Sequence, residues 1–239
     1  MIFTEPPGLD AGGRAAWATL RGPPISHRGL WSAVIPENSL TAFEAACAAG
    51  YAIELDVRLS ADGAPMVFHD AGLERMTGET GPLTARTAAE LGALRLAGSD
   101  DPIPTLVEAL AAVAGRSLVL VELKPEPGGL GELEAAVADQ LDECKGPVAV
   151  IGFDPRTTAW FAERRPGTLR GLNADAGPKA LAYALAHFTL PSLMRLADPV
   201  VQRLRVQGRP AVVWTVRREA EAAAVSALGD NLIFEGFRP

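Results

Sequence analysis

Residues 53–70 are IELDVRLSADGAPMVFHD, which combines an alternating segment, a turn dipeptide and a second short apolar run. The alternation over residues 52–59, together with its β-forming side chains, predicts a strand. The dipeptide Asp62-Gly63 suits the φ > 0 positions of a two-residue hairpin turn. Residues 65–68 would then be a hairpin extension of the preceding strand and not a separate strand of the main sheet.

Two carboxylates lie on one face of this predicted strand. Side chains at i and i+2 of a strand project together, so Glu54 and Asp56 are neighbours that repel each other unless a divalent cation binds between them. A two-residue loop pairs Ala61 with Ala64 and Asp56 with His69, which places an imidazole opposite the acids. A cation beside a titratable histidine suits hydrolysis of a phosphate ester. The alternative is a solvent-facing hairpin whose acids happen to alternate.

Outward from this stretch, the chain repeats a strand followed by a helix. Strands are predicted at residues 25–27, 52–59, 118–123, 148–153, 169–172, 187–190, 211–216 and 232–234. Helices are predicted near residues 40–49, 105–114, 130–143, 156–165, 178–186, 195–207 and 218–228. This order predicts parallel strands covered by helices, and eight such units close naturally as a TIM (β/α)8 barrel. An open doubly wound sheet is the alternative, but no Gly-rich dinucleotide loop follows the first strand.

We expect one domain over residues 1–239. Residues 71–102 are turn-rich, with a short helix near residues 87–94, and we interpret them as a small insertion after the second-strand hairpin, at the mouth of the barrel. Residues 1–24 are rich in Pro and Gly, with a helical patch around residues 15–20. We expect them to cover the bottom of the barrel.

Composition excludes several classes of protein. The 239 residues are 48% hydrophobic and carry a net charge of −7 with scattered basic residues, which argues against nucleic acid or an anionic membrane as partner. No apolar run approaches a membrane span, and the N-terminus lacks the pattern of a signal peptide. Cys47 and Cys144 are expected to be free thiols. We expect a cytoplasmic monomer or homodimer that acts on a small molecule.

The active sites of such barrels lie at the carboxyl ends of the strands. Those ends supply, in chain order, His27 and Arg28, then Glu54 and Asp56 with His69 on the hairpin, then Glu122 and Lys124, Trp214 and Glu235. Two of the three histidines therefore accompany acids. His187 has no acidic neighbour, so we expect it in the core or a loop.

These residues belong to a longer series of motifs, in the order HRG (27–29), PENS (36–39), ELD (54–56), VFHD (67–70), LERMTGETG (73–81), VELK (121–124) and VWTV (213–216). The series resembles the glycerophosphodiester phosphodiesterase family, of the PLC-like phosphodiesterase superfamily, over about residues 25–238. The resemblance implies a TIM barrel of lipid and glycerol metabolism. It also implies cleavage of glycerophosphodiesters to sn-glycerol 3-phosphate and an alcohol with Ca²⁺ or Mg²⁺.

Carried over to this chain, the resemblance implies a role for nine residues. Glu54, Asp56 and Glu122 match the metal ligands, and His27 and His69 match the general acid–base pair. Arg28 and Lys124 match phosphate-contacting cations, Glu37 matches a polar residue near the first histidine, and Trp214 matches an aromatic wall. Histidines of opposite protonation state predict a bell-shaped pH profile.

The chain departs from the family pattern at several strand ends. Glu235 stands where the family often has aspartate, Arg217 where asparagine is frequent, and Gly152 where serine is common. These departures concern leaving-group specificity more than the reaction. Two other functions compete: a lysophospholipase D-like or cyclising enzyme on lysophospholipids, and a catalytically silent phosphate- or metal-binding barrel. The polar insertion disfavours the first, and the complete set of acids and histidines disfavours the second.

Overall fold

The computed structural model of the chain describes residues 3–144, 146–173 and 185–239. Within these residues, one sheet contains nine strands. They are β1 (Ile25–His27), β2 (Ala52–Leu59), β3 (Pro65–Val67), β4 (Val119–Leu123), β5 (Val148–Ile151), β6 (Leu169–Asn173), β7 (Phe188–Leu190), β8 (Val212–Val216) and β9 (Asn231–Phe234). The helical elements are α1 (Ala11–Thr19), α2 (Leu40–Ala48), α3 (Glu74–Thr77), η1 (Leu83–Ala85), α4 (Ala88–Gly92), α5 (Leu106–Val113), α6 (Glu132–Asp142), α7 (Pro155–Arg164), η2 (Leu193–Arg195), α9 (Pro199–Val206) and α10 (Glu219–Leu228).

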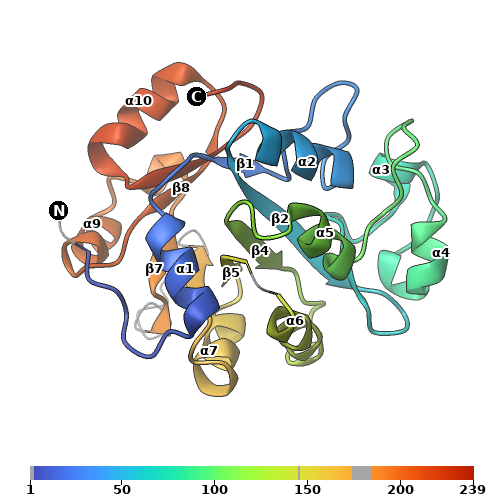
Figure 1. Ribbon diagram of the computed structural model, residues 1–239, viewed down its shortest axis with the longest axis horizontal. Helices are drawn as coiled ribbons and strands as arrows, with labels where there is room; N and C mark the ends of the chain where they lie inside the picture. The colour runs from blue at the N-terminus through green and yellow to red at the C-terminus, as the bar shows by residue number, and fades with distance from the viewer. Residues whose placement is uncertain (1–2, 145, 174–184) are drawn as a thin grey trace.

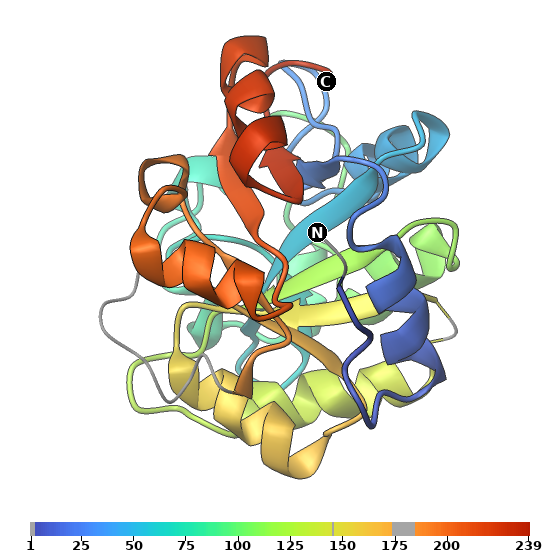
Figure 2. The same cartoon turned by 90° about the vertical axis from the view of Figure 1, so that its left-hand side faces the viewer.

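Eight of these strands are parallel and close into a barrel. Their order is β7-β6-β5-β4-β2-β1-β9-β8, and every neighbouring pair is parallel. Parallel bridges from Thr189 to Ala211 and from Ser192 to Trp214 join the two ends of this path. Helices surround the strands on the outside (Figure 1, Figure 2). The predicted TIM (β/α)8 barrel is confirmed.

Strand β2 divides its side chains between two environments. Ile53, Leu55 and Val57 are fully buried in the layer between the sheet and the helices α2 and α5. Because successive side chains of a strand point to opposite faces, Glu54 and Asp56 project into the barrel interior. The same alternation applies to β4, so the acids of both strands face the barrel axis at the carboxyl end.

Helix α1 covers the bottom of the barrel, as expected for the N-terminal segment. Trp17 and Leu20 are buried in the interior cluster beside Ile25, which is the first residue of β1. The helix is capped by Asp10, whose side chain accepts the Gly13 N–H at 2.7 Å. The opposite, carboxyl end of the barrel is therefore the end available to a ligand.

The predicted register of the β2–β3 hairpin is wrong by one residue. Leu59 pairs with Pro65, which puts Asp56 opposite Phe68 instead of His69. The reason is Ser60: its hydroxyl accepts the Ala64 N–H at 2.9 Å and donates to Asp62 at 2.6 Å, which opens the turn to a three-residue loop. The antiparallel hairpin itself is confirmed. His69 still reaches the barrel mouth, because it directly follows the last paired residue.

The segment 71–102 has a small core of its own beside the hairpin. Leu73, Leu83 and Leu91 are buried against Phe68 and Met66 of the hairpin. Figure 1 shows α3 and α4 at one side of the molecule, beyond α2 and α5. The segment is therefore packed onto the barrel through β3, close to the strand ends that carry His69.

Four smaller expectations concern features away from the barrel mouth. Cys47 and Cys144 are free. His187 directly precedes β7, and burial with the nearby Arg170 and Arg209 charges lowers its pKa to about 3. The predicted helix at residues 178–186 falls almost entirely outside the described residues. None of the described helices has both the length and the apolar character needed to cross a bilayer.

Candidate active site

Three buried carboxylates meet at the carboxyl ends of β2 and β4. Asp56 and Glu122 are register partners on these neighbouring strands, and Glu54 precedes Asp56 on the same face. One oxygen from each of the three lies within 4.8 Å of the others. Burial and the repulsion of the other two acids raise the pKa of Glu54 well above its usual value.

The donor set fits a hard divalent cation. Glu54 Oε1 is buried and accepts no hydrogen bond in the described part of the chain, although a buried polar atom without a partner is costly. Carboxylate oxygens are the ligands that Ca²⁺ and Mg²⁺ prefer. A bound cation would satisfy this oxygen and relieve the repulsion among the acids, so the chemistry of the cluster fits a divalent metal ion.

Two basic side chains border the carboxylates. Lys124 Nζ lies 3.2 Å from Asp56 Oδ1 and also bonds Glu122. Arg28 Nε lies 3.3 Å from Asp56 Oδ2. Burial alone would raise the pKa of Asp56, but the charges of Lys124 and Arg28 outweigh it and lower that pKa. Asp56 is therefore held as a carboxylate, with positive charge on both of its sides.

The HRG motif places both the backbone N–H and the side chain of Arg28 against the carboxylates. Arg28 has a φ of +59°, and its N–H donates to Glu54 Oε2 at 3.1 Å. Asn38 has a φ of +56°; its N–H donates to the Arg28 carbonyl and its side-chain amide donates to Asp56 Oδ2 at 2.8 Å. The next residue, Ser39, caps α2. The PENS segment thus fixes one acid of the cluster.

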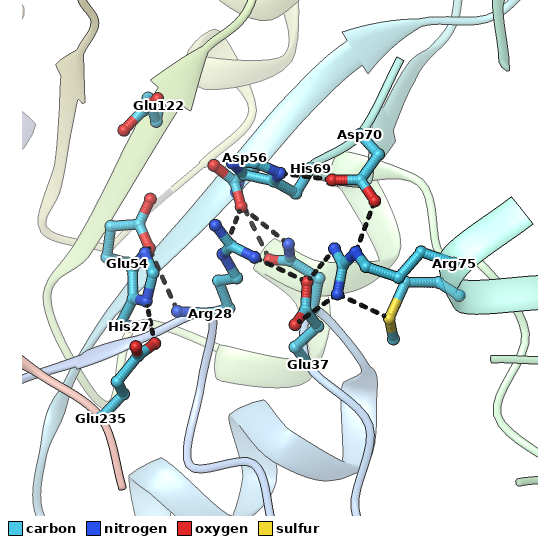
Figure 3. A network of polar contacts seen from close by, with 12 residues as sticks. His27, Arg28, Glu37, Glu54, Asp56, His69, Asp70, Arg75, Glu122 and Glu235 are labelled. Carbon is cyan, nitrogen blue, oxygen red and sulfur yellow. Dashed lines mark hydrogen bonds and ion pairs between the residues drawn. The ribbon is translucent and has the colours of Figure 1, made fainter. Parts of the chain in front are cut away.

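His27 lies between two acids (Figure 3). Its Nδ1 is 2.6 Å from Glu235 Oε2, and its Nε2 is 3.9 Å from Glu54 Oε2. Glu235 follows β9, the barrel neighbour of β1. Burial opposes ionisation of Glu235, but its contacts with His27 and Arg217 lower its pKa to about 2. The imidazole therefore presents Nε2 to the carboxylate cluster.

His69 belongs to a second chain of contacts (Figure 3). Its Nδ1 is 2.6 Å from Asp70 Oδ1, and Asp70 accepts a hydrogen bond from Arg75 Nε at 2.5 Å. Arg75 also donates to both oxygens of Glu37, and Glu37 accepts a hydrogen bond from Arg28 at 2.8 Å. Burial is the largest effect on His69 and lowers its pKa. The insertion is thus connected to the centre of the site through Arg75.

Eight of the nine residues expected from the sequence are joined in this network. Trp214, the ninth, lies outside it in the described part of the chain. Its indole N–H donates to the Leu190 carbonyl at 2.8 Å, and its ring packs edge-on against Phe153 with centroids 5.3 Å apart. Trp214 lies within β8, and Phe153 comes two residues after the end of β5.

Five further residues contact this network without having been given a specific role from the sequence, although Glu235 was expected at the same strand ends: Asn38, Asp70, Arg75, Arg217 and Glu235. Asp70 could have been found from its position directly after His69, and Asn38 from its place within PENS. Local pattern does not pair Arg75 with Glu37 or Arg217 with Glu235, because these partners are 38 and 18 residues apart in sequence.

Comparison with known proteins agrees with this geometry. The model of the glycerophosphoryl diester phosphodiesterase family matches residues 27–234. A glycerophosphodiester phosphodiesterase of Caldanaerobacter subterraneus subsp. tengcongensis is 28% identical over 228 residues, which cover 87% of this chain and 92% of that protein.

Solved structures give the same result. A phosphodiesterase of Oleispira antarctica, solved in complex with the product sn-glycerol-3-phosphate, has a TM-score of 0.83 and 26% identity over 92% of this chain and 94% of that one. A glycerophosphodiester phosphodiesterase of Agrobacterium tumefaciens has a TM-score of 0.73 and 25% identity, covering 88% of this chain and 94% of its own. On the family match, which spans most of the barrel and both histidines of the site, this chain belongs to the glycerophosphoryl diester phosphodiesterase family of enzymes.

Proposed function

We propose that this enzyme hydrolyses glycerophosphodiesters to sn-glycerol 3-phosphate and an alcohol, with Mg²⁺ or Ca²⁺ on Glu54, Asp56 and Glu122. The observation that carries the proposal is the meeting of these three buried acids with two imidazoles and two basic side chains. Among the described residues, one oxygen of the acids accepts no hydrogen bond. The product bound in the Oleispira antarctica phosphodiesterase supports the choice of substrate. A cation held there would stabilise negative charge on the phosphoryl group.

The basic residues beside the acids would bind the phosphodiester. Arg28 and Lys124 are largely buried, and both remain charged: burial opposes ionisation of Lys124, but Asp56 and Glu122 raise its pKa. Fixed positive charge in a water-poor site stabilises a phosphoryl group whose charge grows in the transition state. Glu37 would orient Arg28, to which it is hydrogen-bonded. Trp214 would bound the glycerol or the leaving group.

The two histidines would move the protons of the reaction. One imidazole accepts the proton of the attacking hydroxyl, the P–O bond to the alcohol breaks, and the other imidazole donates a proton to the departing oxygen. Each has Nδ1 engaged by a carboxylate, so Nε2 is the nitrogen free to act. The attacking hydroxyl belongs either to water or to a neighbouring group of the substrate.

The test is release of glycerol 3-phosphate from glycerophosphocholine and glycerophosphoethanolamine. We expect turnover with Mg²⁺ or Ca²⁺, loss of activity with chelator, and a loss of at least about a hundredfold for His27→Ala and His69→Ala. His187→Gln is the matched control, because this histidine precedes β7 and so lies at the amino ends of the parallel strands, opposite the site. Absence of turnover on every glycerophosphodiester with metal supplied would refute the proposal.

One observation favours a second candidate, the lysophospholipase D-like or cyclising activity. A hollow of about 450 Å³ lies beside Glu235, with Leu30, Trp31, Ile35 and Phe237 among its lining residues. Such an apolar lining could hold part of an acyl chain. Phosphorus NMR of products from lysophosphatidylcholine separates the cases, since a linear monoester, a cyclic phosphate and unreacted lipid give different signals.

A further inference from the structure

The contact between His27 and Glu235 extends to a third residue. Glu235 uses one oxygen for each partner: Oε2 lies 2.6 Å from His27 Nδ1, and Oε1 accepts the Arg217 Nε–H at 2.7 Å. Because both of its oxygens are engaged, Glu235 has little freedom to rotate away from the imidazole. Arg217 is thus placed to hold Glu235 in the orientation that meets Nδ1.

The backbone explains why Arg217 reaches Glu235. Strands β8 and β9 are in parallel register at Val213, but the register shifts by one residue before Val216. Such a bulge re-aims the residues that follow it. After the shift the Glu235 N–H donates to the Val216 carbonyl at 3.1 Å, which leaves Arg217 next to Glu235. The Arg217 N–H is held by Glu221 Oε2 at 2.8 Å.

An acceptor at Nδ1 decides which nitrogen of a neutral imidazole carries the hydrogen. A carboxylate there holds the hydrogen on Nδ1 and leaves the lone pair on Nε2, a role that carboxylates also play for histidines in metal sites. Nε2 of His27 is the atom that faces Glu54, at 3.9 Å. The tautomer with the hydrogen on Nδ1 is therefore the one that can accept a proton at the carboxylate cluster.

We propose that Glu235 and Arg217 are a positioning pair that holds His27 with its Nδ1 hydrogen toward Glu235 and its Nε2 lone pair toward the reacting phosphodiester. This role rests on the proposed function, in which His27 moves a proton. The ionised state of Glu235, whose pKa is about 2, is consistent with it.

His69 is also held by a carboxylate and an arginine, but its arginine is tied to a further residue of the site. Its carboxylate, Asp70, is adjacent in the chain and is held by Arg75, which is also bound by Glu37. Arg217 has Glu235 as its ion-pair partner, and its side chain is 63% exposed. The Glu235–Arg217 pair can therefore be changed by substituting the exposed Arg217, with little disturbance to His69.

The test combines kinetics with imidazole ¹⁵N NMR on the metal-loaded full chain. Glu235→Met keeps the bulk and removes the acceptor; we expect kcat to fall about 10- to 100-fold with KM changed less than about threefold. We expect the His27 ¹⁵N shifts to move from the Nδ1–H pattern toward a mixture of tautomers. Glu235→Asp, which keeps the carboxylate, should recover part of both losses. Assignment follows from His→Gln variants of the three histidines.

Arg217→Ala tests the outer member of the pair. We expect a fall in kcat of about two- to fivefold, the size of an exposed ion pair, and no further fall when it is added to Glu235→Met. Arg218→Ala is the matched control: the neighbouring arginine is also exposed but pairs with Glu221, so kcat should stay at the wild-type value.

Two results would overturn the positioning role while leaving the phosphodiesterase function intact. One is a Glu235→Met enzyme with wild-type kcat. The other is a loss of kcat while His27 keeps the Nδ1–H tautomer. If instead the wild-type chain releases no glycerol 3-phosphate, the function fails, and the NMR arm still decides whether Glu235 sets the tautomer. If Glu235→Met does not fold, the Glu235→Asp and Arg217→Ala variants carry the same comparison.

Discussion

The side-chain amide of Asn38 donates to Asp56 Oδ2 over 2.8 Å, and Asn38 Oδ1 lies 3.4 Å from the Asp56 N–H. Both residues are almost completely buried. Asn38 also has a left-handed backbone, which Asn and Asp adopt more readily than most residues. A loop residue before α2 therefore neutralises part of the charge repulsion at the end of β2.

Asn38→Asp replaces the amide donor with a carboxylate, which joins Glu54 and Glu122 beside Asp56. The substitution keeps the same side-chain shape and backbone preference. We expect the metal-free protein to lose about 2 kcal/mol of unfolding free energy at pH 7, since a buried acceptor loses its partner. Urea unfolding in chelator at pH 7 and pH 5 measures this. The loss should shrink at pH 5, where the new carboxyl can bind a proton. Equal stability of the two proteins at pH 7 would contradict this role of Asn38.

Arg75 joins Asp70 to Glu37, and through them His69 to Arg28. Arg75→Ala leaves both acids without their shared cation, so both side chains gain freedom. We expect kcat on glycerophosphocholine to fall about tenfold, as for other residues that orient active-site groups.

The control for this prediction is Arg86→Ala in the same insertion. Arg86 forms an ion pair with the exposed Glu79 at 3.2 Å, and pairs of this kind contribute little. We expect wild-type kinetics from it. A similar loss from both variants would mean that the insertion, and not the Arg75 contacts, is what the enzyme requires.

Gly29 of the HRG motif combines a φ of +81° with close packing. A Cβ built there would lie 2.8 Å from Ala42 Cβ, and backbone atoms of Ala42 are nearly as close. Gly50 has a similar φ of +77° and nothing within 4 Å of such a Cβ. We expect Gly50→Ala to cost about 1 kcal/mol and Gly29→Ala at least about 2 kcal/mol more. Equal losses in denaturant unfolding would show that Ala42 and α2 move aside freely.

His187 predicts a pH dependence of stability that does not involve the active site. Its folded pKa is about 3, well below the usual 6.5. Between these values the unfolded chain binds the additional proton, so stability is complete above pH 6.5 and is lost as pH falls toward 3. At pH 5 this one residue should cost up to about 2 kcal/mol.

The measurement compares urea unfolding of wild type and His187→Gln at pH 7.5 and pH 5. Glutamine does not titrate in this range, so the variant should lose less stability than wild type between the two pH values. The same pH-induced loss in both proteins would show that other groups cause the acid sensitivity.

The sequence by itself determined the barrel and the family to which the chain belongs. Short apolar strands separated by helical stretches allow few arrangements other than parallel strands covered by helices. The period of two then fixed the faces of Glu54, Asp56 and Glu122, because side-chain direction along a strand is a local property. The order of the motifs then indicated the family, without any knowledge of the contacts among those residues.

Tertiary structure alone decided the hairpin register and the partners of the histidines. The register depends on Ser60, whose side chain competes with the tighter turn that Asp62-Gly63 favours. The His27–Glu235 contact joins positions 208 residues apart, and such a pair meets only because closure of the barrel makes β9 the neighbour of β1. Local pattern carries no information on contacts that chain closure creates, which is why the contacts of Glu235 with His27 and Arg217 were found only in the folded chain.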